Sequence, residues 1–161
     1  MKSALVVIDV QNYFVNDKTK DLPSKIAAFI ENNIYDYVLF SQFVNESGSN
    51  FFKLLNWQKN TSSPEIDIDP AFLRFAKPEN TFKKSTYSIF KANGLKEFLD
   101  RENITKLDLC GIDTDSCVLA SAYDAFDLGY EVKVLKDLSL SHSGEDFHNA
   151  AIKIIDKSIQ K

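Results

Sequence analysis

Short apolar runs alternate along the chain with segments of helical periodicity. The first run, residues 4–9 (ALVVID), is apolar until its final acid, which is typical of a strand buried on both faces of a parallel sheet. A helix is predicted next in LPSKIAAFIENN, where Pro23 is placed to open it. Residues 36–44 (DYVLFSQFV) predict a second strand, and residues 50–57 (NFFKLLNW) predict a short helix.

The second half of the chain repeats this alternation more regularly. Residues 80–84 (NTFKK) predict a short strand, and GLKEFLDREN predicts a helix. Residues 106–112 (KLDLCGI) predict a strand, followed by a helix that ends at Gly129, the strand YEVKVLKDL and a last helix over residues 144–159. We therefore expect an α/β fold, with a mostly parallel sheet and helices on both faces, in a single domain spanning residues 1–161.

Composition disfavours several classes of function. The net charge is −4 and no long basic run occurs, so we expect no nucleic-acid partner. The apolar runs are too short to span a bilayer, and the first residues lack the apolar core of a signal peptide, so we expect a cytoplasmic protein with no membrane partner. A GxGxxG motif is absent after the first strand, which disfavours a dinucleotide, and we expect no cofactor.

Polar side chains at three predicted strand ends are the first candidates for a functional site. In open α/β sheets, ligands bind beyond the carboxyl ends of the strands. Asp9, Lys84 and Cys117 each follow or end such a strand, and Gln11 adds polarity to the mouth beyond Asp9. The three residues are far apart in the sequence, but such a fold can bring Asp9, Lys84 and Cys117 to one edge of the sheet.

Cys117 has two interpretations. As a buried thiol it would only pack, which suits Cys110 inside the apolar run LDLC. However, Cys117 follows three residues that favour helix N-caps, so it is predicted in the first turn of a helix. Backbone N–H groups there favour the thiolate, lower the thiol pKa and stabilise an oxyanion. The two cysteines form no disulfide framework and no CxxC metal pattern.

Asp9 and Lys84 each have a structural alternative as well. An aspartate at a strand end commonly caps a neighbouring element or forms an ion pair, but beside a thiol it would be a suitable general base. Lysines are usually solvated, and strand alternation sends Lys83 and Lys84 to opposite faces, so at most one of them can reach the site.

Three motifs in sequence order resemble those of the isochorismatase-like cysteine hydrolases, which include nicotinamidases, N-carbamoylsarcosine amidases and isochorismatases. The segment VVIDVQNYF is similar to their opening motif, KSTYSIF to their lysine motif and GIDTDSCVLASAYDAFDLGYEV to their nucleophile motif. The resemblance selects Lys84 and implies a catalytic triad of Asp9, Lys84 and Cys117. It also implies a three-layer Rossmann-like domain with a sheet of about six strands.

The same resemblance implies details of the nucleophile turn and of the metal status. It places a non-proline cis peptide between Ile112 and Asp113, and an oxyanion hole at the backbone N–H groups of Asp113 and Cys117. The D-x-H metal motif of nicotinamidases is missing from LFSQFVNESGSNFF, so we expect no metal site of that type. His148 is expected to face solvent or to cap the last helix, and His142 is placed where it could approach the site.

The favoured function is hydrolysis of a C–N bond in a small amide or carbamoyl substrate through a thioester, without a metal. An isochorismatase-type vinyl-ether hydrolase would leave Cys117 unused, and a non-enzymatic binding protein on this scaffold would not need the triad. The expected pocket residues are Gln11, Phe14, Trp57, Tyr87 and Phe90. Residues 50–57 carry more apolar surface than one short helix can bury, which predicts either a lid or the interface of a homodimer or larger homo-oligomer.

Overall fold

A computed structural model describes all residues 1–161 and shows a parallel sheet of five strands in the order β3-β2-β1-β4-β5. The strands are β1 (Lys2–Ile8), β2 (Tyr37–Phe43), β3 (Thr81–Lys84), β4 (Ile104–Ile112) and β5 (Glu131–Leu140). They correspond to the five strands that the sequence predicts, of which β1, β2 and β4 contain long apolar runs and β3 and β5 also carry exposed charged residues. The sixth strand implied by the resemblance is absent, because the chain after β5 forms only a turn and a helix.

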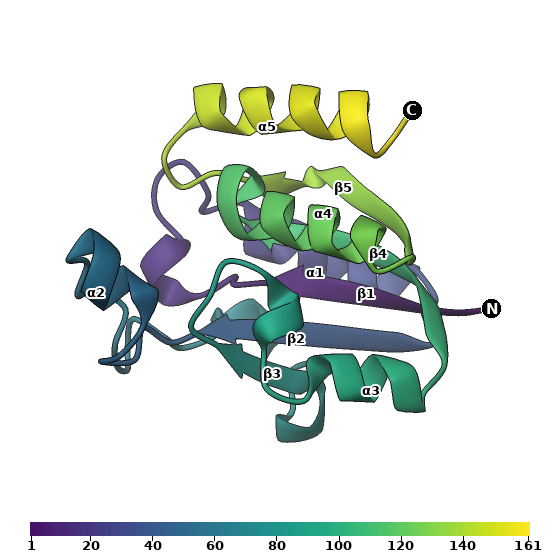
Figure 1. Cartoon of the computed structure of the whole chain (residues 1–161), viewed down its shortest axis with the longest axis horizontal. Coiled ribbons are helices and arrows are strands. Elements are labelled where there is room, and N and C mark those ends of the chain that lie inside the picture. The colour runs from purple at the N-terminus through teal and green to yellow at the C-terminus, as the bar shows by residue number, and fades with distance from the viewer.

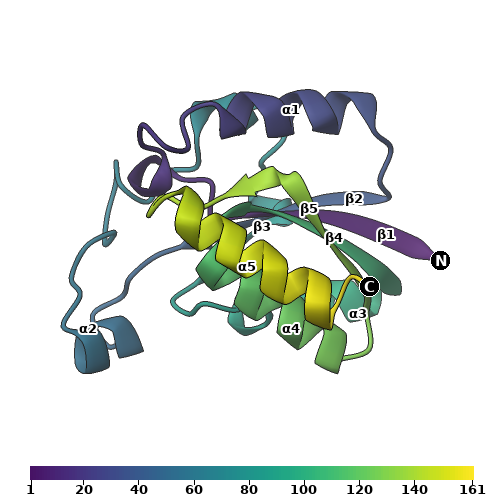
Figure 2. The same ribbon diagram turned by 90° about the horizontal axis from the view of Figure 1, so that it is seen from above.

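Helices cover both faces of the sheet (Figure 2). The helices are α1 (Leu22–Asn32), α2 (Asn50–Leu55), α3 (Leu95–Arg101), α4 (Leu119–Asp127) and α5 (Glu145–Ser158). Helix α1 covers one face, whereas α3, α4 and α5 cover the other. Short 3-10 helices occupy Asn12–Phe14, Pro70–Phe72, Pro78–Asn80 and Ile89–Lys91, and a π-helical turn occupies Thr114–Val118. Helix α2 projects away from these layers (Figure 1).

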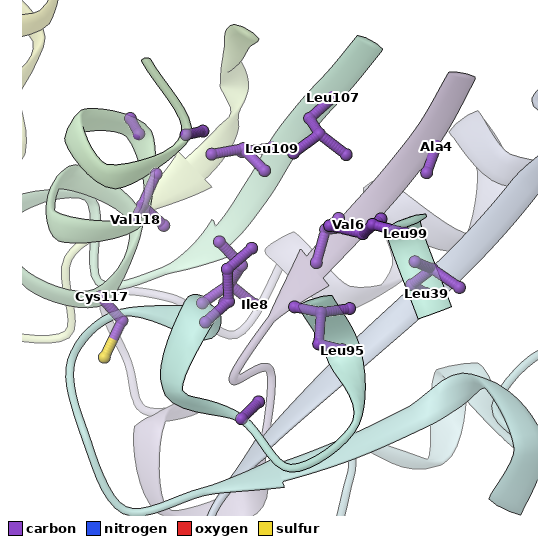
Figure 3. Packing of buried hydrophobic residues seen from close by; sticks show 14 of the residues in the cluster. Ala4, Val6, Ile8, Leu39, Leu95, Leu99, Leu107, Leu109, Cys117 and Val118 are labelled. Atoms are coloured by element: carbon purple, nitrogen blue, oxygen red, sulfur yellow. The ribbon is translucent and has the colours of Figure 1, made fainter. Parts of the chain in front are cut away.

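The core consists of two apolar clusters, one on each face of the sheet. Strand β1 lies at the centre and contributes to both, because its alternate side chains point to opposite faces. Ala4, Val6 and Ile8 pack toward α3 and α4, while Leu5 and Val7 pack toward α1. This double burial is the physical reason for the continuous apolar run. Figure 3 shows the first cluster, with Cys117 at its edge and its sulfur directed away from the packed side chains.

Gly111 sits where β4 passes the end of β1, one residue before the strand ends. Its φ of +124° is a backbone conformation that residues with a side chain rarely adopt. A Cβ added at this position would also lie only 2.2 Å from the Ile8 carbonyl oxygen. Only glycine therefore allows the two strands to approach this closely. The approach brings the turn after β4 beside the end of β1.

None of the helices combines the length and the apolar character that a membrane-spanning segment needs.

Candidate active site

The ends of β1, β3 and β4 bring Asp9, Lys84 and Cys117 together. Lys84 Nζ donates a hydrogen bond to Asp9 Oδ2 at 2.8 Å and lies 3.5 Å from Cys117 Sγ. The three residues are 0%, 3% and 7% exposed, respectively. Lys83, the neighbouring lysine, is exposed, as strand alternation requires. The structure thus places the three residues as the sequence predicted, in a buried group at the carboxyl edge of the sheet.

Asp9 is held by its backbone and by both of its carboxylate oxygens. Its φ of +51° is uncommon for a residue other than glycine, and such backbone conformations cluster at functional sites. Ser41 Oγ donates to Asp9 Oδ1 at 2.8 Å, while Lys84 occupies the other oxygen. Sequence reasoning missed Ser41, although a hydroxyl near the end of the apolar run 36–44 was an available signal.

Lys84 uses its ammonium group to connect the site. Besides Asp9, it donates to the backbone oxygen of Thr86 at 2.7 Å, and its Nζ lies 5.2 Å from the centre of the Phe43 ring. Burial opposes the charged form, but the adjacent Asp9 and Cys117 outweigh it and raise the Lys84 pKa above its usual value. Lys84 is therefore a permanent positive charge in the site.

Cys117 lies in the π-helical turn Thr114–Val118, and α4 begins only at Leu119. The sequence predicted a thiol in the first turn of an α-helix, with a lowered pKa. That prediction is wrong, because burial raises the pKa of the Cys117 thiol well above its ordinary value. Lys84 acts in the opposite direction, and the Asp9 carboxylate adds to the rise by its charge and by hydrogen bonding. The resting thiol is protonated and has a carboxylate within reach.

The turn before Cys117 contains the backbone groups expected for an oxyanion hole. The peptide bond between Ile112 and Asp113 is cis, as the resemblance implies. The Asp113 carbonyl oxygen accepts from the N–H groups of Ser116 and Val118, each at 3.1 Å. The Asp113 N–H donates to no other group of the protein, so it remains available to a ligand.

A pocket of about 270 Å³ opens beside Cys117. Its walls are mainly aromatic, and they come from the Asn12–Phe14 turn, the end of β2, the α2 segment and the loop after β3: Tyr13, Phe14, Phe43, Phe51, Trp57 and Tyr87. Many of these rings meet edge to face, for example Phe43 with Phe51 at 5.0 Å and Tyr13 with Trp57 at 5.7 Å between centres. A larger hollow of about 860 Å³ lies along β3 but does not border Cys117.

Three of the five expected pocket residues, Phe14, Trp57 and Tyr87, line this pocket, and the other two do not. The Gln11 amide is used to join neighbouring backbones: Nε2 donates to the Phe43 oxygen at 2.9 Å, and Oε1 accepts from the Phe43 N–H at 2.7 Å. Phe90 packs on the apolar cluster and against Tyr130, with 5.6 Å between the ring centres. Both side chains therefore serve the fold.

The two histidines have different surroundings. His142 lines the pocket, and its Nδ1 lies 2.6 Å from Asp113 Oδ2. The hydrogen bond to Asp113 is the main cause of a His142 pKa above its usual value. Burial lowers this pKa, and the negative charges of Asp113 and Asp115 raise it further. His148 was expected to face solvent or cap α5, but its Nδ1 lies 2.7 Å from Thr114 Oγ1 and it is only partly exposed. Desolvation there lowers the His148 pKa.

Comparison with known proteins identifies the family. Residues 3–160 match the family model described as the isochorismatase domain. The chain belongs to the isochorismatase domain family. It is 28% identical to the uncharacterized isochorismatase family protein PncA of Bacillus subtilis (strain 168), with 90% of each chain covered.

Solved structures extend this likeness to most of both chains. The nicotinamidase PncA from Bacillus subtilis has a TM-score of 0.81 at 27% identity, with 99% of this chain and 97% of that chain covered. The N-carbamoylsarcosine amidase from Thermoplasma acidophilum has a TM-score of 0.76 at 18% identity, over 99% and 93% of the two chains, and shows the shared fold. As a member of this isochorismatase domain family, the protein is a hydrolase.

The region in which this family member would hold a nicotinamidase-type metal does not fit one. No three His, Cys, Asp or Glu side chains form a metal-ligand group in the structure. After β2, Asn45 Nδ2 donates to the backbone oxygens of Trp57 and Lys59, and its Oδ1 accepts from Ser49 Oγ at 2.6 Å. These polar atoms are occupied in holding the loop and are not available to a metal.

Proposed function

We propose that the protein is a cysteine amidohydrolase that cleaves the C–N bond of a small amide or carbamoyl compound through a thioester on Cys117. The observation that carries this proposal is the buried Asp9–Lys84–Cys117 group at the base of an aromatic pocket. The likeness to a nicotinamidase over nearly the whole chain supports amide hydrolysis as the reaction class.

The first step is activation of the thiol. Because burial keeps the Cys117 thiol protonated, the sulfur needs a base at the moment of attack. Asp9 is the carboxylate beside it, and Ser41 and Lys84 fix its two oxygens in place. As Cys117 Sγ forms a bond with the substrate carbonyl carbon, Asp9 accepts the thiol proton.

The second step is collapse of the tetrahedral intermediate. Its oxyanion accepts hydrogen bonds from the Asp113 and Cys117 backbone N–H groups. When the C–N bond breaks, Asp9 returns its proton to the nitrogen, so ammonia or an amine leaves and a thioester remains on Cys117. In the final step Asp9 takes a proton from water, the hydroxyl adds to the thioester, and the acid leaves as the proton returns to the sulfur.

Lys84 carries no proton in this sequence. Its raised pKa keeps it charged, so it offsets the negative charge on Asp9 in the resting state. When the proton moves from sulfur to Asp9, the negative charge moves toward Cys117, only 3.5 Å from the same ammonium group. The Lys84 ammonium thus stabilises the negative charge both when it lies on Asp9 and when it moves toward Cys117.

The test is ammonia release from a panel of small amides, ureas and carbamoyl acids. The Cys117→Ala variant should lose at least about 1000-fold in turnover, because the nucleophile is gone. The matched control is Cys110→Ala, since Cys110 is also a buried thiol but packs in the cluster on the α1 face. The control should keep its turnover. Substantial activity in Cys117→Ala would rule out the covalent mechanism.

A further inference from the structure

We propose that His142 determines specificity by binding a hydrogen-bond acceptor at the end of the substrate away from the scissile amide, and that Asp113 positions it for this. The expected substrate is therefore a small, flat amide that carries one acceptor, either a ring nitrogen or a carboxylate. The choice of amides rests on the proposed function, but the contact itself is independent of catalysis.

The orientation of the His142 ring is fixed by two hydrogen bonds to one carboxylate. Asp113 Oδ2 lies 2.6 Å from His142 Nδ1, and Asp113 Oδ1 accepts from the His142 backbone N–H at 2.7 Å. A carboxylate only accepts, so Nδ1 carries a hydrogen. The ring also packs edge to face on Phe14, with 5.3 Å between the centres. These contacts leave Nε2 as the ring atom without a partner in the protein.

The free nitrogen is a donor when the ring is protonated, and the charges around His142 favour that form. Asp113 and Asp115, both in the turn after β4, favour the imidazolium, and Lys18, from the loop before α1, opposes it. Tyr13 and Phe14 complete the surroundings with their aromatic rings. The side chain is 31% exposed and lines the same pocket as Cys117, so its Nε2–H is accessible to a ligand.

The polarity of the pocket disfavours the opposite choice, a cationic substrate. An aromatic cage is a common binding site for ammonium groups. Here, however, the Lys84 ammonium already lies over the Phe43 ring, at 5.2 Å from its centre. The one carboxylate of the lining, that of Asp113, has both oxygens occupied by His142. The pocket therefore presents a donor to its ligand and has no free carboxylate for a cation.

The size and walls of the pocket define the rest of the substrate. A volume of about 270 Å³ is slightly below the range for drug-sized ligands, so it suits a single ring. The aromatic walls favour a flat, unsaturated group by stacking and by apolar contact. A molecule with its amide at Cys117 and its acceptor at His142 satisfies both polar ends of this cavity.

The experiment measures binding by calorimetry at pH 6.0, using the Cys117→Ala protein, which lacks the proposed nucleophile. The probes are benzamide, 3-pyridinecarboxamide, 4-carbamoylbenzoate and the cationic 4-(aminomethyl)benzamide. At least one of the two acceptor-bearing amides should bind about 10- to 100-fold more tightly than benzamide, the range for a hydrogen bond to a charged group. The pyridine and carboxylate probes distinguish the two kinds of acceptor.

Two variants in the same background test whether His142 is responsible. His142→Phe keeps a ring beside Phe14 but has no donor, so the preference over benzamide should disappear. The matched control is His148→Gln, which changes the histidine outside the pocket and should keep the preference. As a measurement without a change at His142, the ¹⁵N resonance of its Nε2 should shift on titration with the preferred acceptor amide, while that of His148 stays in place.

The inference is overturned by an equal preference in His142→Phe, by tighter binding of the cationic amide or of benzamide, or by binding of none of the four probes. It also fails if the acceptor ligand binds without shifting the His142 signal. None of these outcomes depends on turnover, so ammonia release by the wild-type protein from other amides would leave the proposed function standing.

Discussion

Replacing Lys84 with methionine removes a buried positive charge and keeps a long apolar side chain in its place. In the wild-type protein, the Lys84 and Asp9 side chains are both 0% exposed and share a 2.8 Å ion pair. Lys84→Met leaves the Asp9 carboxylate in the interior with Ser41 as its remaining side-chain donor. Removing one partner of such a pair costs about 3–5 kcal/mol, because the other charge stays buried without compensation.

This cost predicts a large change in thermal stability. For a domain of this size, each kcal/mol lowers the melting temperature by about 2–4 °C, so the variant should melt roughly 6–20 °C below the wild-type protein. The matched control is Lys83→Met, since Lys83 is the exposed neighbour on the same strand. It should change the free energy of unfolding by less than about 0.5 kcal/mol.

A double variant separates the loss of the pair from the loss of lysine packing. Asp9→Asn keeps a residue that tolerates the left-handed backbone at this position. The Asp9→Asn/Lys84→Met protein should be more stable than Lys84→Met alone, because no unpaired charge remains. Chemical unfolding followed by circular dichroism measures all four proteins. If Lys84→Met cost no more than Lys83→Met, the assignment of a desolvated ion pair would be refuted.

Three further predictions follow from other parts of the structure. Gly111→Ala should cost several kcal/mol in urea unfolding, since its Cβ would overlap the β1 backbone, and a cost below about 1 kcal/mol would contradict this close approach. The raised pKa of His142 should stabilise the protein fully below pH about 6.5 and lose this effect as the pH rises through the folded-state value. The unfolding free energy of the wild-type protein relative to Asp113→Asn should therefore fall as the pH rises above about 6.5, and a constant difference would be inconsistent with the ion pair. We also propose a homodimer whose interface includes α2, because Leu54 and Leu55 on this helix are 75% and 61% exposed. Light scattering should therefore give a mass of twice 18.3 kDa for the wild-type protein. The Leu54→Glu variant should give the mass of the monomer. A wild-type monomer would instead favour α2 as a lid.

The sequence predicted the elements well because burial leaves a direct mark on composition. The inner strands β1, β2 and β4 are largely buried and contain long apolar runs, whereas the edge strands β3 and β5 mix buried with exposed residues. All five strands were found, although β4 begins at Ile104 rather than at residue 106. The order of the strands leaves no such mark. It is this order, β3-β2-β1-β4-β5, that brings Lys84 to the edge beside Asp9. The positions of the residues at strand ends made that grouping possible, and the resemblance selected it.

The parts that were missed depend on partners that are distant in the sequence. Gln11 was expected in the pocket, but its side-chain amide forms two hydrogen bonds with the backbone of Phe43 at the end of β2. His142 and Asp113 are 29 residues apart, and no local pattern links them. The pKa of Cys117 depends on how deeply the turn is buried, whereas the preceding polar residues indicated only a helix start.

The most direct test of the covalent mechanism is the intact mass of the protein during turnover. With an amide that releases ammonia, acid quenching in the steady state should trap a fraction of the chains as a thioester, heavier by the acyl group, with the adduct on the peptide that contains Cys117. Cys110→Ala should show the same adduct, and Cys117→Ala should show neither adduct nor turnover. Full turnover by Cys117→Ala, or an adduct that maps to another residue, would contradict the assignment of Cys117 as the nucleophile.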